Sequence, residues 1–449
     1  MNRIAKRSTV ALIVCVVFLL GFGVFVVEFL TNCEEWALFP GSPHVYNGGN
    51  IGCGTVCDRE GNVLLMLDDG RYYHTDPLVR QATVHWLGDR KGSVSAPALS
   101  HYASQIVSYD ILGGVYVYGS QGSTAYMTLS AQMQKAALEA LGDYRGTVAV
   151  MNYKTGELLC AVSTPTFDPD APVTEVVESM YLNRFTQGLY TPGSIYKTVT
   201  LAAALEENPE ITKMLFTCTG TVSYGVNKVT CETVHGAQTV QDAFRNSCNC
   251  AFAHIADMLG REKLMQYAEK FGVTDSVKFD GITTAKGKFD LKDAAPVSVA
   301  WSAVGQYTNQ VGPAAFLQFM GAVANGGVTT PLYLVSRIQE GYKKHHEAEP
   351  AAGERIMSGE TAALLKTYLR YNVTDKYGDE NFAGFSVGAK TGTAEVGGDK
   401  KPNAMLSGFT ADGDCPLAFI ICVEDGGYGK TVCIPIAEKV LAAAKIALG

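Results

Sequence analysis

The stretch GTVAVMNYKTGELLCAV, residues 146–162, decides the fold of this 449-residue chain. Its two apolar runs, 146–151 and 158–162, lie on either side of a short polar turn that contains Gly156. Two apolar runs separated by a glycine-containing turn are typical of a β-hairpin. The stretch therefore predicts two neighbouring antiparallel strands.

A second hairpin is predicted near the end of the chain, where apolar runs at 406–410 and 416–423 flank an Asp-Gly turn at 412–413. Residues 130–141 have the spacing of an amphipathic helix that starts after a serine cap. A final helix is expected over 435–448. Hairpins at both ends of a domain, with helices between them, indicate an antiparallel sheet flanked by helices, an α+β architecture.

The N-terminus carries a predicted membrane anchor. Arg3, Lys6 and Arg7 precede an almost wholly apolar, uncharged run over 8–27, and roughly 20 such residues cross a bilayer. Basic residues before the run predict that the N-terminus lies inside the cell. The alternative, a cleaved secretory signal, lacks a convincing small-residue cleavage site. We therefore expect a single-pass anchor within residues 1–31.

The overall composition limits the class of protein. Hydrophobic residues make up 47% of the chain and charged residues 18%, which is ordinary for a globular protein with room for two domains. The formal net charge is -8, and no basic stripe offsets it. This balance argues against a nucleic-acid partner.

Twelve cysteines are a high count for a chain of this length. Cys218 and Cys231 bracket a short segment rich in turn-forming residues, and we expect a disulfide between them. Two closely spaced pairs match no zinc knuckle and have no histidine at ligand spacing beside them: Cys53 with Cys57, and Cys248 with Cys250. The spacing therefore predicts no metal site.

The segment TPGSIYK at residues 191–197 offers a candidate nucleophile. Its Pro-Gly pair places Ser194 at the start of a helix, and Lys197 follows three residues later on the same helical face. A serine hydroxyl is a weak nucleophile until a base takes its proton, and a lysine with a lowered pKa can be that base. The helix N-terminus supplies amide groups for an oxyanion. In isolation, the same pair also fits a solvated helix surface.

A second candidate is Ser247-Cys248-Asn249, which precedes an apolar helix over 251–259. In an extended turn Ser247 and Asn249 would point to the same side, where they could relay a proton and hold a substrate amide. The alternative is that one of them only caps the next helix.

The third candidate, Lys390-Thr391-Gly392-Thr393, follows a predicted strand over 385–389. A glycine within a strand permits close approach of another backbone, and the lysine and threonines suit a carboxylate. An ordinary strand end with a solvated lysine is the alternative. The same Lys-Thr-Gly tripeptide recurs at 154–156, at the tip of the first hairpin, where we expect a purely structural role.

Order and spacing make the three candidates specific, since Ser194 lies 53 residues before Ser247, which lies 143 residues before Lys390. Ser-x-x-Lys, Ser-x-Asn and Lys-Thr-Gly-Thr in this order resemble the penicillin-binding transpeptidases. The resemblance covers residues 55–449. Flanking segments share it, several of them with the class B subgroup: 154–158, 163–169, 325–327 with Pro331, 54–61, Cys218, Cys231, His235-Gly236 and 247–249.

The resemblance implies a domain order: a cytoplasmic tip and transmembrane anchor at 1–31, an N-terminal pedestal module at 32–125, and a penicillin-binding transpeptidase domain at 126–449. The pedestal is shorter than in many members, and no glycosyltransferase domain is recognisable. We expect a class B enzyme in the cell membrane, with its catalytic domain outside the cytoplasm and a separate glycosyltransferase as partner.

The resemblance also implies the chemistry. Ser194 would form the acyl-enzyme, Lys197 would accept its proton, Ser247 would relay that proton, Asn249 would hold the substrate amide, and Lys390 would lie beside them. The expected substrate-binding residues are Thr391, Gly392 and Thr393. Peptidoglycan stem peptides and β-lactams would be the ligands, without a metal or organic cofactor. The alternatives are a D,D-carboxypeptidase or serine β-lactamase, and a catalytically inactive β-lactam-binding scaffold.

Overall fold

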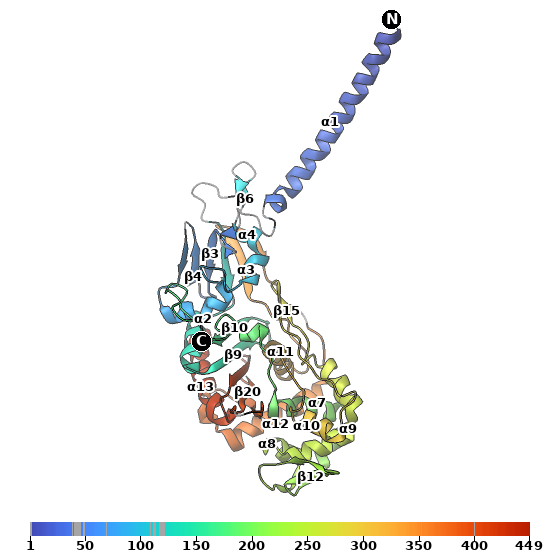
Figure 1. The fold of residues 1–449 in the computed structure, drawn as a ribbon, viewed down its shortest axis with the longest axis vertical. Helices are drawn as coiled ribbons and strands as arrows, with labels where there is room; N and C mark the ends of the chain where they lie inside the picture. The colour runs from blue at the N-terminus through green and yellow to red at the C-terminus, as the bar shows by residue number, and fades with distance from the viewer. Residues whose placement is uncertain are drawn as a thin grey trace.

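The computed structural model describes residues 2–37, 39, 46–47, 50–68, 70–107, 109–110, 114–115, 122–351, 353–398 and 400–449. A long N-terminal helix, α1 (Asn2–Ala37), projects away from the folded body (Figure 1). Within α1, Arg3–Cys33 is long and apolar enough to cross a membrane. Its large apolar side chains are exposed, Phe18 by 72%, which suits a helix surrounded by lipid.

A five-stranded antiparallel sheet forms the centre of the larger domain, in the order β10-β9-β21-β20-β19. Both predicted hairpins are present in it, and the α+β fold is confirmed. The strand bounds are β9 (Arg145–Asn152), β10 (Leu158–Thr164), β19 (Val387–Ala394), β20 (Asn403–Thr410) and β21 (Leu417–Glu424).

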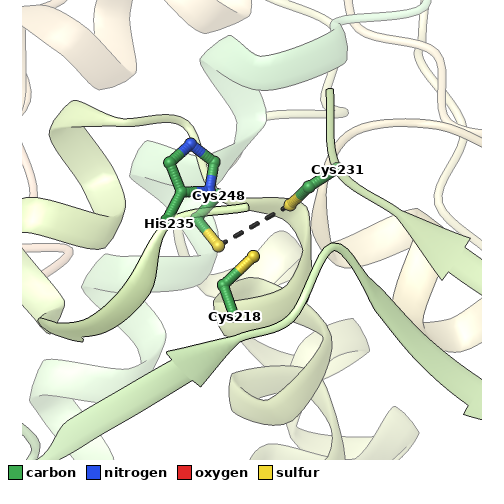
Figure 2. A group of neighbouring side chains, drawn as sticks. All are labelled: Cys218, Cys231, His235 and Cys248. Atoms are coloured by element: carbon green, nitrogen blue, oxygen red, sulfur yellow. Dashed lines mark hydrogen bonds between the residues drawn. The ribbon is translucent and has the colours of Figure 1, made fainter. Parts of the chain in front are cut away.

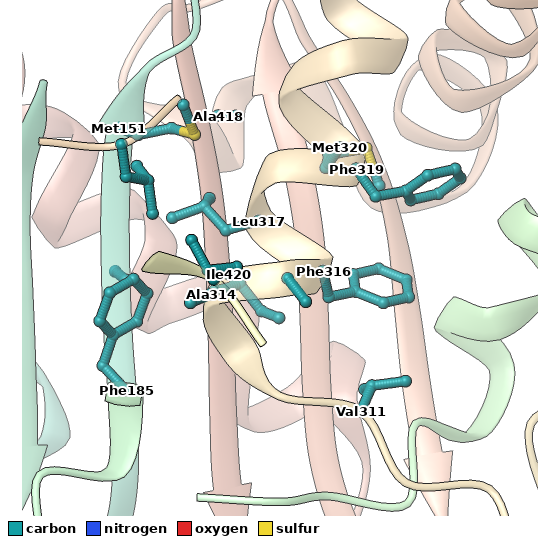
Figure 3. Close-up of a cluster of buried hydrophobic side chains, with 14 of the residues drawn as sticks. Met151, Phe185, Val311, Ala314, Phe316, Leu317, Phe319, Met320, Ala418 and Ile420 are labelled. Carbon is teal, nitrogen blue, oxygen red and sulfur yellow. The ribbon is translucent and has the colours of Figure 1, made fainter. Parts of the chain in front are cut away.

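Helices cover both faces of this sheet. Val148 and Val150 of β9 pack in the cluster that contains α5 (Ala131–Leu141) and α13 (Gly429–Leu448). The alternate β9 residue Met151 packs in the cluster of α11 (Pro313–Ala324), whose Leu317 faces the strands (Figure 3). Side chains alternate between the faces of a strand, so a sheet covered on both faces needs continuous apolar runs.

A helical region lies beside β19, at the edge of the sheet, with α12 packed on β19 and α7 packed on α9 and α12 (Figure 1). The helices are α7 (Lys197–Glu207), α8 (Val240–Arg245), α9 (Asn249–Lys270), α10 (Pro296–Ala303) and α12 (Gly359–Asn372). Two small antiparallel ribbons join them: β11 (Leu215–Cys218) with β14 (Gly236–Thr239), and β12 (Thr221–Tyr224) with β13 (Asn227–Thr230).

The module nearest to α1 is a six-stranded sheet in the order β18-β17-β8-β3-β4-β5 (Figure 1). Two of its strands, β17 and β18, come from far along the chain, so residues 335–347 complete a sheet that the N-terminal segment begins. The bounds are β3 (Gly54–Cys57), β4 (Val63–Leu67), β5 (Arg71–Tyr73), β8 (Thr124–Met127), β17 (Val335–Glu340) and β18 (Lys343–Glu347).

Shorter elements connect these parts of the described chain. Their bounds are β1 (Tyr46–Asn47), β2 (Asn50–Ile51), α2 (Pro77–Leu87), α3 (Pro97–His101), α4 (Ala103–Val107), β6 (Tyr109–Asp110), β7 (Gly114–Val115), α6 (Arg184–Gln187), η1 (Gly193–Tyr196), η2 (Pro209–Lys213), β15 (Lys278–Phe279), β16 (Ile282–Thr283), η3 (Val373–Tyr377) and η4 (Asp379–Phe382).

Candidate active site

Ser194 lies in the short helix η1, which runs directly into α7, so the hydroxyl is at a helix start as expected. Gly193 precedes it with a φ of 53°, a left-handed conformation that favours glycine. A Cβ at Gly193 would lie 2.5 Å from the carbonyl oxygen of Thr393 in β19. The absence of a side chain therefore allows η1 to touch the edge strand, which brings Ser194 beside the Lys-Thr-Gly-Thr segment.

Lys197 is fully buried and lies next to the candidate nucleophile. Its Nζ is 2.7 Å from the Oγ of Ser194 and 2.8 Å from the Oδ1 of Asn249. Burial penalises the charged ammonium and lowers the pKa of Lys197 to about 7. Near neutral pH a large fraction of this amine is therefore unprotonated and can accept a proton from the Ser194 hydroxyl.

Ser247 lies between two buried lysines. Its Oγ is 3.3 Å from the Nζ of Lys197 and 3.1 Å from the Nζ of Lys390. Burial, followed by the positive charges of Lys197 and Lys376, holds the pKa of Lys390 well below its ordinary value. The hydroxyl of Ser247 can therefore pass a proton between amines on either side of it.

The expected extended turn at Ser247-Cys248-Asn249 is wrong. Ser247 has a φ of 56°, and Asn249 is the first residue of α9, capped by Cys248. The side-chain amide of Asn249 donates to the carbonyl oxygen of Thr230 at 2.8 Å, while its oxygen faces Lys197. Ser247 and Asn249 still meet at Lys197, because the left-handed turn and the helix start replace the alternation of a strand.

The Lys-Thr-Gly-Thr segment lies in the edge strand β19. A Cβ at Gly392 would lie 2.9 Å from the carbonyl oxygen of Pro192, which agrees with the close approach expected there. Tyr377 was missed from the sequence: its hydroxyl accepts from the backbone N–H of Thr391 at 3.2 Å and lies 3.0 Å from the Thr391 hydroxyl. A tyrosine in a helical segment 14 positions earlier carries no local signal for such a contact.

The second Lys-Thr-Gly tripeptide lies away from this site, in the turn between β9 and β10. There the Nζ of Lys154 donates to the side-chain oxygen of Asn325 at 2.8 Å. Identical letters thus occupy a hairpin tip in one place and the edge of a cleft in the other.

The candidate residues open onto one cleft of about 860 Å³. Its lining includes Ser194, Ser247, Asn249, Lys390, Thr391 and Thr393. Hydroxyls, an amide and an ammonium line it together, a set suited to a ligand that carries a carbonyl, an amide and a carboxylate. An acyl-transfer site needs this combination of nucleophile, base and anion-binding groups.

A second group of reactive side chains lies at the wall of the same cleft: Cys218, Cys231, His235 and Cys248 (Figure 2). We call it the cysteine–histidine cluster. Cys218 and Cys231 are free thiols here, so the disulfide between them stays a prediction. The spacing of cysteines gave no sign of this cluster, because its members come from four separate segments.

A family model supports the assignment of the fold and the site. The model described as penicillin-binding protein transpeptidase domain matches residues 146–442. The peptidoglycan D,D-transpeptidase PbpA of Mycolicibacterium smegmatis is 29% identical over 362 residues, which cover 72% of this chain and 73% of PbpA. The stage V sporulation protein D of Bacillus subtilis is 33% identical over 314 residues, 66% of this chain and 48% of that protein.

Solved structures share the fold. A ceftriaxone acyl-enzyme complex of penicillin-binding protein A from M. tuberculosis superposes with a TM-score of 0.76 at 23% identity, covering 87% of this chain and 98% of that one. The D,D-transpeptidase domain of a peptidoglycan glycosyltransferase from Eggerthella lenta has a TM-score of 0.74 at 26% identity, covering 88% and 99%.

Proposed function

The chain belongs to the penicillin-binding protein transpeptidase family, and we propose that it cross-links peptidoglycan stem peptides through an acyl-enzyme on Ser194. The observation that carries this proposal is the 2.7 Å contact between the Ser194 hydroxyl and the buried Lys197 amine. A hydroxyl within hydrogen-bond reach of an amine with a lowered pKa is an activated nucleophile.

In the acylation step Ser194 attacks the carbonyl carbon of the penultimate D-alanine of a stem peptide, and its proton moves to Lys197. Ser247 then passes a proton toward the nitrogen of the terminal D-alanine, which leaves as the amide bond breaks. The product is an ester between Ser194 and the shortened stem. The positions of Ser247 between Lys197 and Lys390 support this relay.

In the second step an amine from a neighbouring stem attacks the ester, a new amide bond forms, and the Ser194 oxygen regains a proton. If water takes the place of the amine, the reaction is that of a D,D-carboxypeptidase or a β-lactamase. The same groups serve both steps, because the reverse of a proton transfer needs the same donor and acceptor.

Substrate binding is assigned to the edge strand. Lys390, Thr391 and Thr393 would hold the terminal carboxylate, and its negative charge favours the charged form of Lys390. Gly392 allows the close approach of η1 that keeps Ser194 in reach. The backbone N–H groups of Ser194 and Thr393 would form the oxyanion hole, where one donor contributes about 2.7–4 kcal/mol in other enzymes.

The N-terminal helix fits a single-pass anchor. We infer that residues 1–31 are the cytoplasmic tip and anchor, 32–125 the pedestal and 126–449 the catalytic domain, outside the cytoplasm. A separate glycosyltransferase would supply the glycan strands. The strand pairing of residues 335–347 with the pedestal sheet supports a rigid connection between pedestal and catalytic domain.

The test is labelling of the full chain in detergent with fluorescent penicillin. We expect a stable covalent adduct on the wild type and on Ser223→Ala, whose serine is exposed on β12, and none on Ser194→Ala. Rapid hydrolysis of the penicillin would instead indicate a β-lactamase, and intact penicillin without an adduct would indicate an inactive scaffold. A stem-peptide substrate with an added D-amino acid separates transpeptidation, which incorporates the amino acid, from carboxypeptidation.

A further inference from the structure

The cysteine–histidine cluster brings four metal-ligating side chains together from four segments (Figure 2). Cys218 ends β11, Cys231 follows β13, His235 precedes β14 and Cys248 caps α9. Each residue has a potential ligand atom, and these atoms lie within 4.8 Å of one another. Cys218 and Cys248 are buried, and the other two are half-buried.

The distances fit a tetrahedral metal ion. The Sγ atoms of Cys231 and Cys248 are 3.7 Å apart. Two thiolates on a tetrahedral zinc, each with a Zn–S bond of about 2.3 Å, lie about 3.8 Å apart. A disulfide would need the same two sulfurs at about 2.05 Å. The cluster therefore has the spacing of ligands around a common ion and not that of bonded sulfurs.

The surroundings also suit bound thiolates. The backbone N–H of Cys250 donates to the Sγ of Cys231 at 3.3 Å, and that of Ala251 donates to the Sγ of Cys248 at 3.4 Å. Amide donors at a helix N-terminus favour the thiolate form that binds metals. The Nε2 of His235 lies 3.2 Å from the Thr233 hydroxyl, the outer contact that orients a ligating ring.

An unpartnered buried atom points to a missing ligand. The Nδ1 of His235 is buried and has no hydrogen-bond partner in the structure. An imidazole nitrogen without a partner is costly unless it binds a proton donor or a metal. Three cysteines and one histidine are a common closed ligand set for structural zinc.

We propose that the cysteine–histidine cluster binds a structural zinc ion and thereby fixes the turn that carries Ser247 and Asn249. The ion would join β11, the β13–β14 connection and the start of α9. Two-stranded ribbons are marginally stable by themselves, so β11–β14 and β12–β13 gain most from such a cross-link.

The link to the active site is short. Cys248 is the residue between Ser247 and Asn249, and Asn249 donates to the backbone of Thr230, the neighbour of Cys231. Ser247 holds a left-handed φ of 56°, which a non-glycine residue keeps only when its surroundings enforce it. Zinc binding stands independently of the proposed function, whereas the effect on acylation rests on it.

The first experiment measures metal content by mass spectrometry of the purified full chain. We expect about one zinc per chain in the wild type and in Cys415→Ser, a half-buried cysteine of the β20–β21 turn. Cys218→Ser should lose the zinc, and His235→Cys should retain it, because it restores a four-ligand set. Absence of zinc from wild type expressed and purified with added zinc would overturn the proposal, as would a disulfide found between any two cluster cysteines.

Cobalt substitution and chelation keep the test valid if Cys218→Ser fails to fold. Wild type loaded with Co²⁺ should show the intense visible bands of a tetrahedral thiolate site, and an octahedral spectrum would contradict the assignment. Removal of zinc with a chelator should slow acylation by fluorescent penicillin at least tenfold and lower the melting temperature, with recovery on adding zinc. Unchanged acylation without zinc would overturn the positioning role, and a zinc-loaded wild type that forms no adduct would refute the proposed function instead.

Discussion

The protonation of Lys197 should control the pH dependence of acylation. With a pKa of about 7, the neutral fraction of this amine is about 0.1 at pH 6, about 0.5 at pH 7 and about 0.9 at pH 8. The second-order rate of acylation should therefore rise about ninefold from pH 6 to pH 8 and then level off. An unshifted lysine, with a pKa of about 10.4, would be only about 0.4% neutral at pH 8 and would give no plateau.

The assay is the rate of adduct formation with fluorescent penicillin below saturation, across pH 5.5 to 9, because this rate reports groups of the free enzyme. A rate that rises about tenfold per pH unit up to pH 9, or that stays constant across the range, would refute the base assignment.

Two variants sharpen the test of Lys197. Lys197→Met removes the amine at similar volume, and Lys197→Arg keeps a charge that cannot be lost. Both should reduce the acylation rate by about 10²–10⁴-fold, the usual contribution of general base catalysis. Their melting temperatures separate lost chemistry from lost folding, and a folded variant within threefold of wild type would rule out Lys197 as the base.

Three further changes test the packing around the site. Gly193→Ala should block acylation and lower the melting temperature, because the new Cβ would lie 2.5 Å from the Thr393 carbonyl at a φ of 53°. Tyr377→Phe should slow acylation about tenfold, since the backbone N–H of Thr391 loses its partner at a cost of about 1–2 kcal/mol. Leu317→Ala, in the buried face of α11, should lower the unfolding free energy by about 2–5 kcal/mol without changing the pH profile.

Each of these changes has a matched control. Gly225→Ala places a side chain at a φ of 66° with no atom within 4 Å, so it tests backbone strain without the clash. Tyr342→Phe removes a hydroxyl from a fully exposed ring, and Val226→Ala shortens a fully exposed side chain. Equal effects of a control and its partner would mean that contact at the site is not the cause.

Local patterns in the sequence were enough to predict the hairpins, the order of the motifs and the anchor. Apolar runs around Gly156 and around 412–413 predicted β9–β10 and β20–β21, because strand periodicity and turn chemistry act over a few residues. The uncharged run at 8–27 predicted α1 for the same reason. These features depend only on neighbours along the chain.

Contacts between distant segments needed the tertiary structure. The left-handed conformation of Ser247 and the contact of Tyr377 with Thr391 depend on packing, which leaves no period in the sequence. The pairing of 335–347 with the N-terminal sheet likewise has no local signal.

The cysteine–histidine cluster shows the limit most directly. Cysteine spacing along the chain suggested a disulfide between Cys218 and Cys231, whereas folding brings Cys248 to 3.7 Å from Cys231 and places His235 beside them. The sequence by itself determined which reactive side chains are available. Only the folded chain decided which of them meet, because side-chain proximity is set by the pairing of ribbons and the start of α9, not by separation along the backbone.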